Sequence, residues 1–144
     1  MSAIIVDASV GVKWFVPEYF TPEACQLQVG QDELHVPATF FNIEIANILW
    51  KKIRRAEMTR VEADRILTDL PNLQVTRHAE GPLLLAAFNL ADQTKRTVYD
   101  CLYLALAMKT GGRMVTADLR LYNSLANTLW AHYVLWIGHF GSGP

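Results

Sequence analysis

The chain has 144 residues, of which 51% are hydrophobic, and its 13 lysines and arginines nearly balance its 14 aspartates and glutamates. This hydrophobic content excludes a disordered chain, and the net charge of −1 excludes a uniformly basic surface for nucleic acid. No apolar run reaches the roughly 18 residues of a membrane-spanning helix, and no signal peptide precedes the first strand pattern, so we expect a soluble, cytoplasmic protein without a membrane partner.

Strand and helix patterns alternate along the chain. Ile4-Ile5-Val6-Asp7 is typical of a buried strand, Thr21-Pro22-Glu23 of a helix start, and Thr59-Arg60-Val61-Glu62 of a capping box. The alternation predicts a single three-layer α/β/α domain over 1–140 with a mostly parallel central sheet, followed by a flexible tail over 141–144. We expect strands over 3–7, 34–37, 73–76, 114–117 and 133–137, and helices over 10–16, 21–30, 39–55, 59–70, 83–92, 98–109 and 121–129.

Two aspartates come directly after apolar strand patterns. Asp7 ends the first strand, Asp118 ends Met114-Val115-Thr116-Ala117-Asp118, and small residues lie beside both. Because parallel strands end at the sheet edge where α/β proteins bind ligands, we expect Asp7 and Asp118 to lie close together. Either one alone is equally typical of the N-cap of a following helix.

Two further acids lie within apolar helical segments. Asp100 is the only charge from Val98 to Met108, and Glu44 follows Phe41 by three residues beside an apolar stripe. A buried ionised carboxylate needs a compensating partner, and no Lys or Arg lies one turn from Asp100 within its helix, which argues against an intrahelical salt bridge. Two explanations stay open: hydrogen bonds from backbone amides or a distant arginine, or a site shared with other acids.

A shared site would concentrate negative charge that a hard cation neutralises. Carboxylate oxygens are the ligands that Mg²⁺ or Mn²⁺ prefers, and hydroxyls near the same edge can orient a carboxylate. The predicted metal-binding and catalytic acids are Asp7, Glu44, Asp100 and Asp118, with Thr116 and Ser9 as supporting residues.

The histidines and cysteines show no metal-ligand spacing, which argues against a zinc site. The histidines are expected to be structural or surface residues, and the cysteines to be buried, reduced thiols inside helices. These residues are His35, His78, His132 and His139, and Cys25 and Cys101.

Four cations close the helix expected over 39–55: Lys51, Lys52, Arg54 and Arg55. A solvated helix end and a contact with a phosphate backbone both explain them. The four tryptophans are predicted to include an exposed patch for a partner helix or a second copy, the alternative being that all are core or rim residues. They are Trp14, Trp50, Trp130 and Trp136.

These motifs together resemble the PIN domain of VapC-type toxins. The resemblance runs from Ile4 to about Phe140 and rests on Val6-Asp7-Ala8-Ser9, Glu44-Ile45-Ala46-Asn47, Tyr99-Asp100-Cys101-Leu102-Tyr103-Leu104-Ala105-Leu106-Ala107 and Val115-Thr116-Ala117-Asp118 in this order. Cys101 stands where the family usually has alanine.

The resemblance implies a metal-dependent endoribonuclease that cuts RNA at the four acids. It also implies a toxin that acts with a cognate antitoxin protein, and a homodimer. A non-catalytic PIN-like module that binds RNA or protein is the alternative, but unligated carboxylates in one pocket repel one another, which favours the nuclease.

Two other classes that begin with a strand ending in aspartate lack a required residue. A haloacid-dehalogenase-like phosphatase needs a second acid two residues later, where this chain has Ser9. A phospho-acceptor receiver domain needs a lysine after its last strand, and 133–140 contains none.

Overall fold

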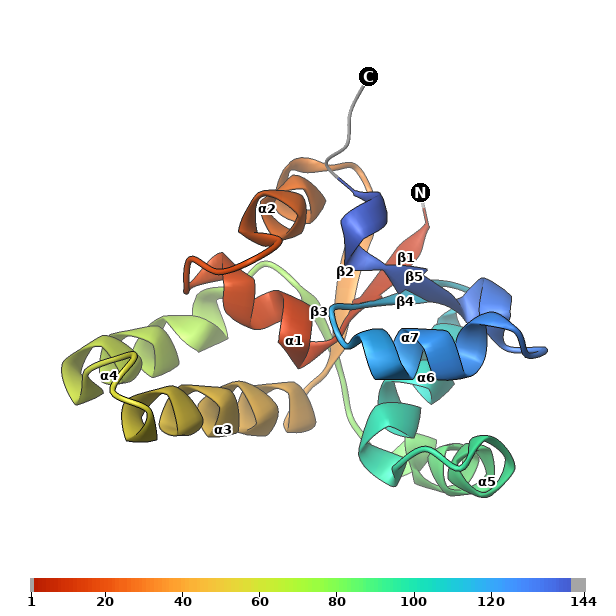
Figure 1. The fold of residues 1–144 in the computed structure, drawn as a ribbon. Helices are drawn as coiled ribbons and strands as arrows, with labels where there is room; N and C mark the ends of the chain where they lie inside the picture. The colour runs from red at the N-terminus through yellow and green to blue at the C-terminus, as the bar shows by residue number, and fades with distance from the viewer. Residues whose placement is uncertain (1, 141–144) are drawn as a thin grey trace.

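In the computed structural model, which describes residues 2–140, five strands form one sheet in the order β3-β2-β1-β4-β5, and every neighbouring pair is parallel (Figure 1). The predicted, mostly parallel sheet is therefore confirmed. The tail expected over 141–144 lies outside the described residues. The strands are β1 (Ala3–Val6), β2 (Glu33–Pro37), β3 (Thr76–His78), β4 (Arg113–Thr116) and β5 (Val134–Trp136).

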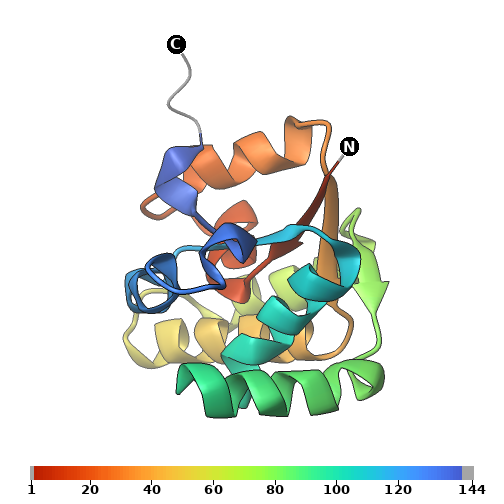
Figure 2. The ribbon, with the colours of Figure 1, turned by 90° about the vertical axis from the view of Figure 1, so that its right-hand side faces the viewer.

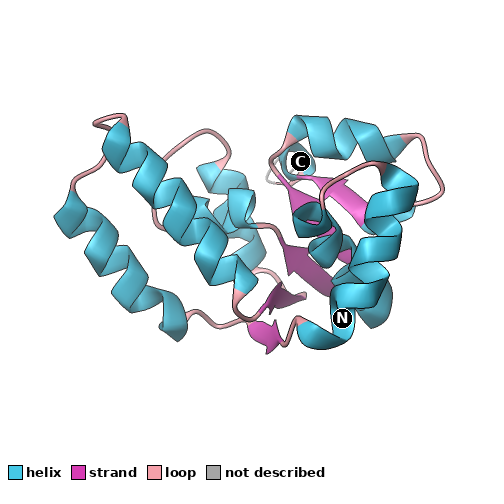
Figure 3. Cartoon of the chain, turned by 90° about the horizontal axis from the view of Figure 1, so that it is seen from below, coloured by secondary structure: helices cyan, strands magenta, loops and turns pink. Residues whose placement is uncertain are grey.

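Helices lie on both sides of this sheet (Figures 1 and 3). None of the helices within residues 2–140 is long and apolar enough to cross a membrane. The α-helices are α1 (Ala8–Gly11), α2 (Thr21–Val29), α3 (Phe40–Arg54), α4 (Arg60–Asp69), α5 (Leu84–Thr94), α6 (Val98–Thr110) and α7 (Leu119–Ala126). The 3-10 turns are η1 (Val12–Trp14), η2 (Leu70–Asn72), η3 (Gly81–Leu83), η4 (Ala131–Tyr133) and η5 (Ile137–His139).

The third strand is the main error in the predicted elements. The apolar run at 73–76 suggested a strand, but β3 begins at Thr76 and ends at His78. Pairing with β2, in which His35 lies opposite Thr76 and Pro37 opposite His78, sets where the strand begins. Leu73 and Val75 instead pack against the core from the connection that precedes the strand.

The capping box that the sequence predicted at the start of α4 is present. Thr59 Oγ1 accepts a hydrogen bond from the Glu62 backbone N–H at 3.1 Å, and the Thr59 backbone N–H donates to Glu62 Oε1 at 3.2 Å. These hydrogen bonds satisfy the backbone N–H groups of Thr59 and Glu62, which have no acceptor within the helix. The first turn of α4 lies where the chain turns back from α3, at the end of the two helices away from the sheet (Figure 1).

The strand order creates a switch point between β1 and β4. From β1 the chain builds outward through β2 and β3, and it then crosses to the other side of β1 to add β4 and β5. Helices connected to strands on opposite sides of such a point diverge and leave a crevice beyond the carboxyl ends of the strands. Asp7 directly follows β1, and Asp118 lies two residues after β4.

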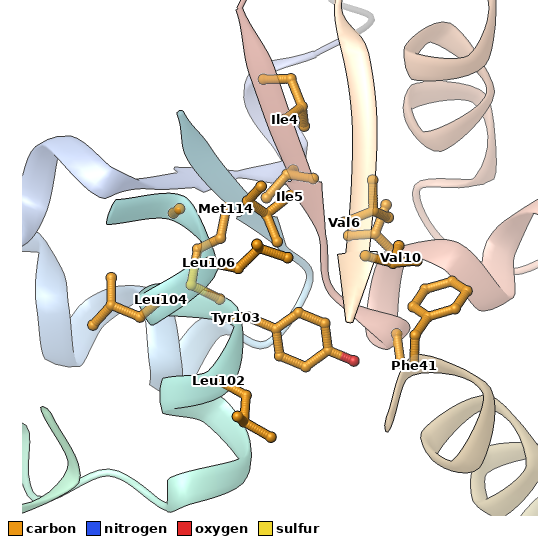
Figure 4. Packing of buried hydrophobic residues seen from close by; sticks show 14 of the residues in the cluster. Ile4, Ile5, Val6, Val10, Phe41, Leu102, Tyr103, Leu104, Leu106 and Met114 are labelled. Carbon is orange, nitrogen blue, oxygen red and sulfur yellow. The ribbon is translucent and has the colours of Figure 1, made fainter. Parts of the chain in front are cut away.

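The core joins α6 to the sheet (Figure 4). Seven consecutive residues of α6, from Cys101 to Ala107, are buried, and they face β1, β2 and β4 on one side and α5 on the other. Figure 2 shows α6 rising obliquely from α5, and the two helices pack against each other. A helix packed on two sides explains the nearly unbroken apolar run of its sequence.

The position of α3 depends on a close contact with α1. Gly11 lies so near the ring of Phe41 that a Cβ at this position would be 2.5 Å from Phe41 Cζ. Only glycine leaves room for this approach. The contact holds the first half of α3, which carries Glu44, beside the carboxyl end of β1.

Candidate active site

Asp7 lies at the centre of the predicted site, where β1 ends and α1 begins. Its backbone N–H donates to the carbonyl of Val115 in β4 at 3.2 Å, and the residue is only 8% exposed. Oδ2 accepts hydrogen bonds from Thr116 Oγ1 at 2.7 Å and from Ser9 Oγ at 3.0 Å. The two residues predicted to support the acids thus both contact Asp7.

Burial changes the protonation of Asp7. The loss of solvent raises its pKa from 3.8 to about 6, although the hydrogen bonds from Thr116 and Ser9 act in the opposite direction. The charge of Asp100 raises it further. Among residues 2–140, no positive charge contributes to the pKa of Asp7, so its burial is offset by hydrogen bonds alone.

Glu44 projects from α3 and is half-buried. Its Oε1 accepts a hydrogen bond of 2.5 Å from the hydroxyl of Tyr103 in α6. Burial, followed by the charge of Asp7, raises the pKa of Glu44 from 4.5 to about 7. The charge of Asp100 raises the pKa of Glu44 further, so two of the other predicted acids disfavour its ionised form.

Tyr103 is a site residue that the sequence analysis missed. It is 1% exposed, and Figure 4 shows it projecting from α6 between the end of β1 and Phe41 of α3. Burial and the charges of Asp7 and Glu44 raise the pKa of its hydroxyl well above 10, so the group remains a hydrogen-bond donor at neutral pH. Tyr103 lies about one turn after Asp100 on the same helix, and this spacing was the sequence signal that could have identified it as a site residue.

Asp100 lies in the first turn of α6, and its partner is an arginine one turn earlier that lies outside the helix, so the argument against an intrahelical salt bridge did not cover it. Arg96 lies four residues earlier, just before the N-cap residue Thr97, and its Nη2 donates to Asp100 Oδ2 at 3.2 Å. Burial raises the pKa of Asp100, Arg96 lowers it and the charge of Asp118 raises it, with a net upward shift. The compensating arginine was overlooked because it precedes the helix.

Asp118 is the N-cap of α7. Its Oδ1 accepts a hydrogen bond of 3.2 Å from the backbone N–H of Leu121, which is the capping alternative that the sequence left open. Its own N–H donates to Thr116 Oγ1 at 3.0 Å, so Thr116 links the surroundings of Asp7 and Asp118. Asp118 still acts on Asp100 through its charge.

The four acids therefore form an electrostatically coupled set beyond the carboxyl ends of β1 and β4. Asp7 acts on Glu44, Asp100 acts on both, and Asp118 acts on Asp100. In residues 2–140, however, no three His, Cys, Asp or Glu side chains converge closely enough to form a ready-made metal site. The donor set, which consists of carboxylates and hydroxyls, nevertheless fits a hard cation such as Mg²⁺ or Mn²⁺.

A cavity of about 680 Å³ lies elsewhere, near the first residues of β2. Its walls include Trp14, Leu27, Glu33 and Leu73, and none of the four acids lines it. It contains no cluster of nucleophilic or acid–base side chains comparable to the set around Asp7. The candidate catalytic groups therefore lie at the edge of the sheet and not in this cavity.

The cysteine prediction is half correct. Cys101 is buried at 1% exposure, whereas Cys25 is exposed on α2. Two of the histidines have a structural contact, since His35 Nδ1 and His78 Nε2 lie 2.8 Å apart and their rings stack across β2 and β3.

The basic end of α3 contains both paired and exposed cations. Lys52 binds Glu18 at 2.8 Å, and the guanidinium of Arg54 lies 5.0 Å from the ring centre of Trp50, while Lys51 and Arg55 are exposed. Trp50 is also the one tryptophan of the four that is largely exposed, at 53%. The predicted tryptophan patch thus reduces to one residue at the α3 surface.

Comparison with known proteins places these observations in a family. The PIN domain family model matches residues 4–124. Ribonuclease VapC3 of Pyrobaculum aerophilum is 38% identical over 122 residues, which cover 82% of this chain and 91% of that protein. Ribonuclease VapC3 of Mycobacterium tuberculosis is 30% identical over 118 residues, covering 82% of this chain and 84% of that protein.

A solved structure has a similar fold. The crystal structure of PAE2754 from Pyrobaculum aerophilum matches with a TM-score of 0.69 at 21% identity, and the match covers 96% of this chain and 85% of that one. This likeness concerns the fold alone. The family model and the sequence relatives, which match over most of the chain, lead to one conclusion: the protein belongs to the PIN domain family, and its relatives include ribonucleases named VapC.

Proposed function

We propose that this protein is a metal-dependent endoribonuclease that hydrolyses RNA phosphodiester bonds at Asp7, Glu44, Asp100 and Asp118. Its relatives carry the name ribonuclease. The observation that carries the proposal is the coupling of the buried acids: burial and mutual repulsion raise the pKa of Asp7 to about 6 and that of Glu44 to about 7. A fold retains such repulsion where a bound cation relieves it.

The acids would hold Mg²⁺ or Mn²⁺ through carboxylate oxygens, as their donor chemistry indicates. When bound, the cation supplies positive charge that stabilises the negative charge developing on the phosphate. Thr116 and Ser9 hold the Asp7 carboxylate in place by donating to Oδ2. Tyr103 does the same for Glu44 through its hydroxyl.

Glu44 makes the reaction sensitive to pH. With its pKa near 7, this carboxyl carries a proton in a large fraction of molecules below neutrality. It must lose that proton before it can act as an anionic ligand. Cleavage should therefore increase as the pH rises from 6 to 8.

The first prediction is that Asp7→Asn and Asp100→Asn each reduce cation-dependent RNA cleavage by at least about a hundredfold. The amide keeps the size of the side chain but removes the charge. The measurement is cleavage of a labelled RNA with Mg²⁺ or Mn²⁺ and with chelator, followed by mapping of the RNA ends.

Asp64→Asn provides the matched control. Asp64 is an exposed acid that pairs with Arg60 on α4, a helix that carries none of the four predicted acids. The Asp64→Asn variant should cleave RNA like the wild type. Normal cleavage by either site variant removes that residue from the site, and RNA binding without any cleavage by the wild type supports the non-catalytic module instead.

We further propose that the nuclease is the toxin of a toxin–antitoxin pair, that it binds a cognate antitoxin protein, and that it forms a homodimer. Several large apolar side chains support the existence of partners, because they remain exposed on helices. These include Ile43 and Trp50 on α3, Leu67 on α4, and Leu84, Leu85 and Phe88 on α5.

A further inference from the structure

Arg96 has an unusual environment for a surface arginine. It follows Lys95, which adopts a left-handed backbone conformation with φ of 62°, and it precedes Thr97, the N-cap of α6. Its own N–H donates to Thr94 Oγ1 at 3.2 Å, so the backbone is held between the end of α5 and the start of α6. The side chain thus extends from a fixed point beside Asp100.

The guanidinium is only partly satisfied. Nη2 donates to Asp100 Oδ2 at 3.2 Å, but Nε is buried and has no hydrogen-bond acceptor within residues 2–140. A buried N–H without an acceptor destabilises the conformation that buries it. The conformation in which Arg96 pairs with Asp100 thus carries the free-energy penalty of an unsatisfied Nε–H. A cation that competes for the Asp100 carboxylate would therefore displace Arg96 readily.

Arg96 also has a distinctive place among the charges. Within residues 2–140, it is the cation that forms an ion pair with one of the four predicted acids. The side chains of Arg96 and Asp100 are 26% and 24% exposed, so the pair lies at a rim that a dissolved ion can reach. A divalent cation approaching the acids meets Asp100 already bound to an internal positive charge.

We propose that Arg96 is a displaceable counter-ion, which occupies Asp100 in the cation-free protein and competes with the divalent cation for this carboxylate. The inference rests on the proposed function. Arg96 is a positioning residue in this role. It holds Asp100 until the cation arrives, and it raises the cation concentration that the site needs.

The test measures Mn²⁺ binding in the absence of RNA. Binding is followed by electron paramagnetic resonance of free Mn²⁺ at pH 8 for wild type and variants. Arg96→Met keeps the bulk of the side chain but removes the charge, and it should bind Mn²⁺ about three- to tenfold more tightly than wild type. A merely structural role for Arg96 predicts the opposite, weaker binding by a loosened site.

Two variants isolate the charge. Arg96→Lys keeps the positive charge beside Asp100 and should bind Mn²⁺ nearly as the wild type does. Arg60→Met removes an arginine with the same spacing to an aspartate, since Arg60 Nε lies 2.8 Å from Asp64 Oδ1 four residues later, but on exposed α4. It should leave Mn²⁺ affinity unchanged.

The outcomes separate this inference from the proposed function. Tighter binding by Arg96→Met with wild-type binding by Arg96→Lys supports it, and unchanged or weaker binding by Arg96→Met overturns it. Asp100→Asn is measured alongside: if it binds Mn²⁺ as tightly as wild type, the metal site itself is wrong and the inference fails with it. Arg96→Gln replaces Arg96→Met in the comparison if circular dichroism shows that the methionine variant is unfolded.

Discussion

The protonation of Glu44 depends on its burial and on electrostatic repulsion by the neighbouring acids. Its folded pKa of about 7 lies above the ordinary 4.5 because burial and the charge of Asp7 disfavour the ionised form. The folded protein therefore binds more protons than the unfolded chain between these values. Glu44 lowers the stability of the cation-free protein at pH 8, and this penalty disappears as the pH falls through 7 toward 5.

We expect Glu44→Gln to stabilise the cation-free protein by about 1–2 kcal/mol at pH 8 and by much less at pH 5. Glutamine preserves an oxygen that can accept the Tyr103 hydroxyl but carries no charge. The measurement is urea unfolding of both proteins in chelator at the two pH values. A stability difference that does not change with pH would show that Glu44 is not strained by its charge.

Comparing the two proteins is necessary because other groups also titrate in this range. Asp7, with a pKa of about 6, acts in the same direction as Glu44. His78 acts in the opposite direction, since burial and the neighbouring His35 lower its pKa below 6.5 and the unfolded chain then binds more protons. The contribution of His78 is common to wild type and variant and cancels in the difference, whereas that of Asp7 cancels only in the part that does not depend on the charge of Glu44.

At the scale of elements, one carboxylate joins α3 to the turn that follows α1. Glu18 Oε1 binds Lys13 of η1 at 2.9 Å, and Glu18 Oε2 binds Lys52 of α3 at 2.8 Å. Lys13 is largely buried, with 9% of its side chain exposed. Burial tends to raise the pKa of Glu18, but the hydrogen bonds and charges of the two lysines outweigh it and lower the pKa.

Glu18→Gln should destabilise the protein by about 1–3 kcal/mol at pH 7, because it leaves the buried Lys13 without its carboxylate. The depressed pKa means that this stabilisation is present above pH 4.5 and is lost as the pH falls through the folded pKa. Denaturant unfolding at pH 7 and pH 3.5 measures the difference. Asp92→Asn is the control, since its contact with Lys95 is 3.7 Å long and exposed; equal effects of the two changes would contradict the bridging role.

At the scale of the whole molecule, three apolar side chains form an exposed surface on α5. Leu84, Leu85 and Phe88 are 59%, 72% and 62% exposed, and they lie within little more than one turn of the helix. Phe88 follows Leu84 by four positions and Leu85 by three, and residues at these spacings lie on one face of a helix. Such a group is a reasonable place for the second copy in the proposed homodimer.

We therefore expect light scattering at micromolar concentration to give twice the chain mass of 16.2 kDa. Phe88→Ser should shift the protein toward the monomer, because it removes a large exposed ring from this surface. Trp50→Ser, on α3, is the matched control and should remain dimeric. A wild type that is monomeric under these conditions would rule out the homodimer.

Much of the architecture follows from local signals in the sequence. Glu62 completes the capping box of Thr59, and Gly111 ends α6 with a φ of 68°, a conformation that glycine adopts without strain. The carboxyl ends of parallel strands share one edge, so a strand ending at Asp7 and another ending near Asp118 were expected to be neighbours. Periodicity and caps carry this information because they depend on residues close together in the chain.

Only the tertiary structure decided which partners the acids have. The pairing of Glu44 with Tyr103 joins residues 59 positions apart, and the bonds from Thr116 to Asp7 span 109 positions. The start of β3 at Thr76 and the exposure of Cys25 likewise depend on which strand or helix packs alongside. Sequence patterns predicted that carboxylates gather beyond β1 and β4, but the burial and most of the hydrogen bonds that set their protonation arise from contacts between distant segments, which no local pattern encodes. The pair of Arg96 with Asp100 is the local exception, since the two residues are four positions apart.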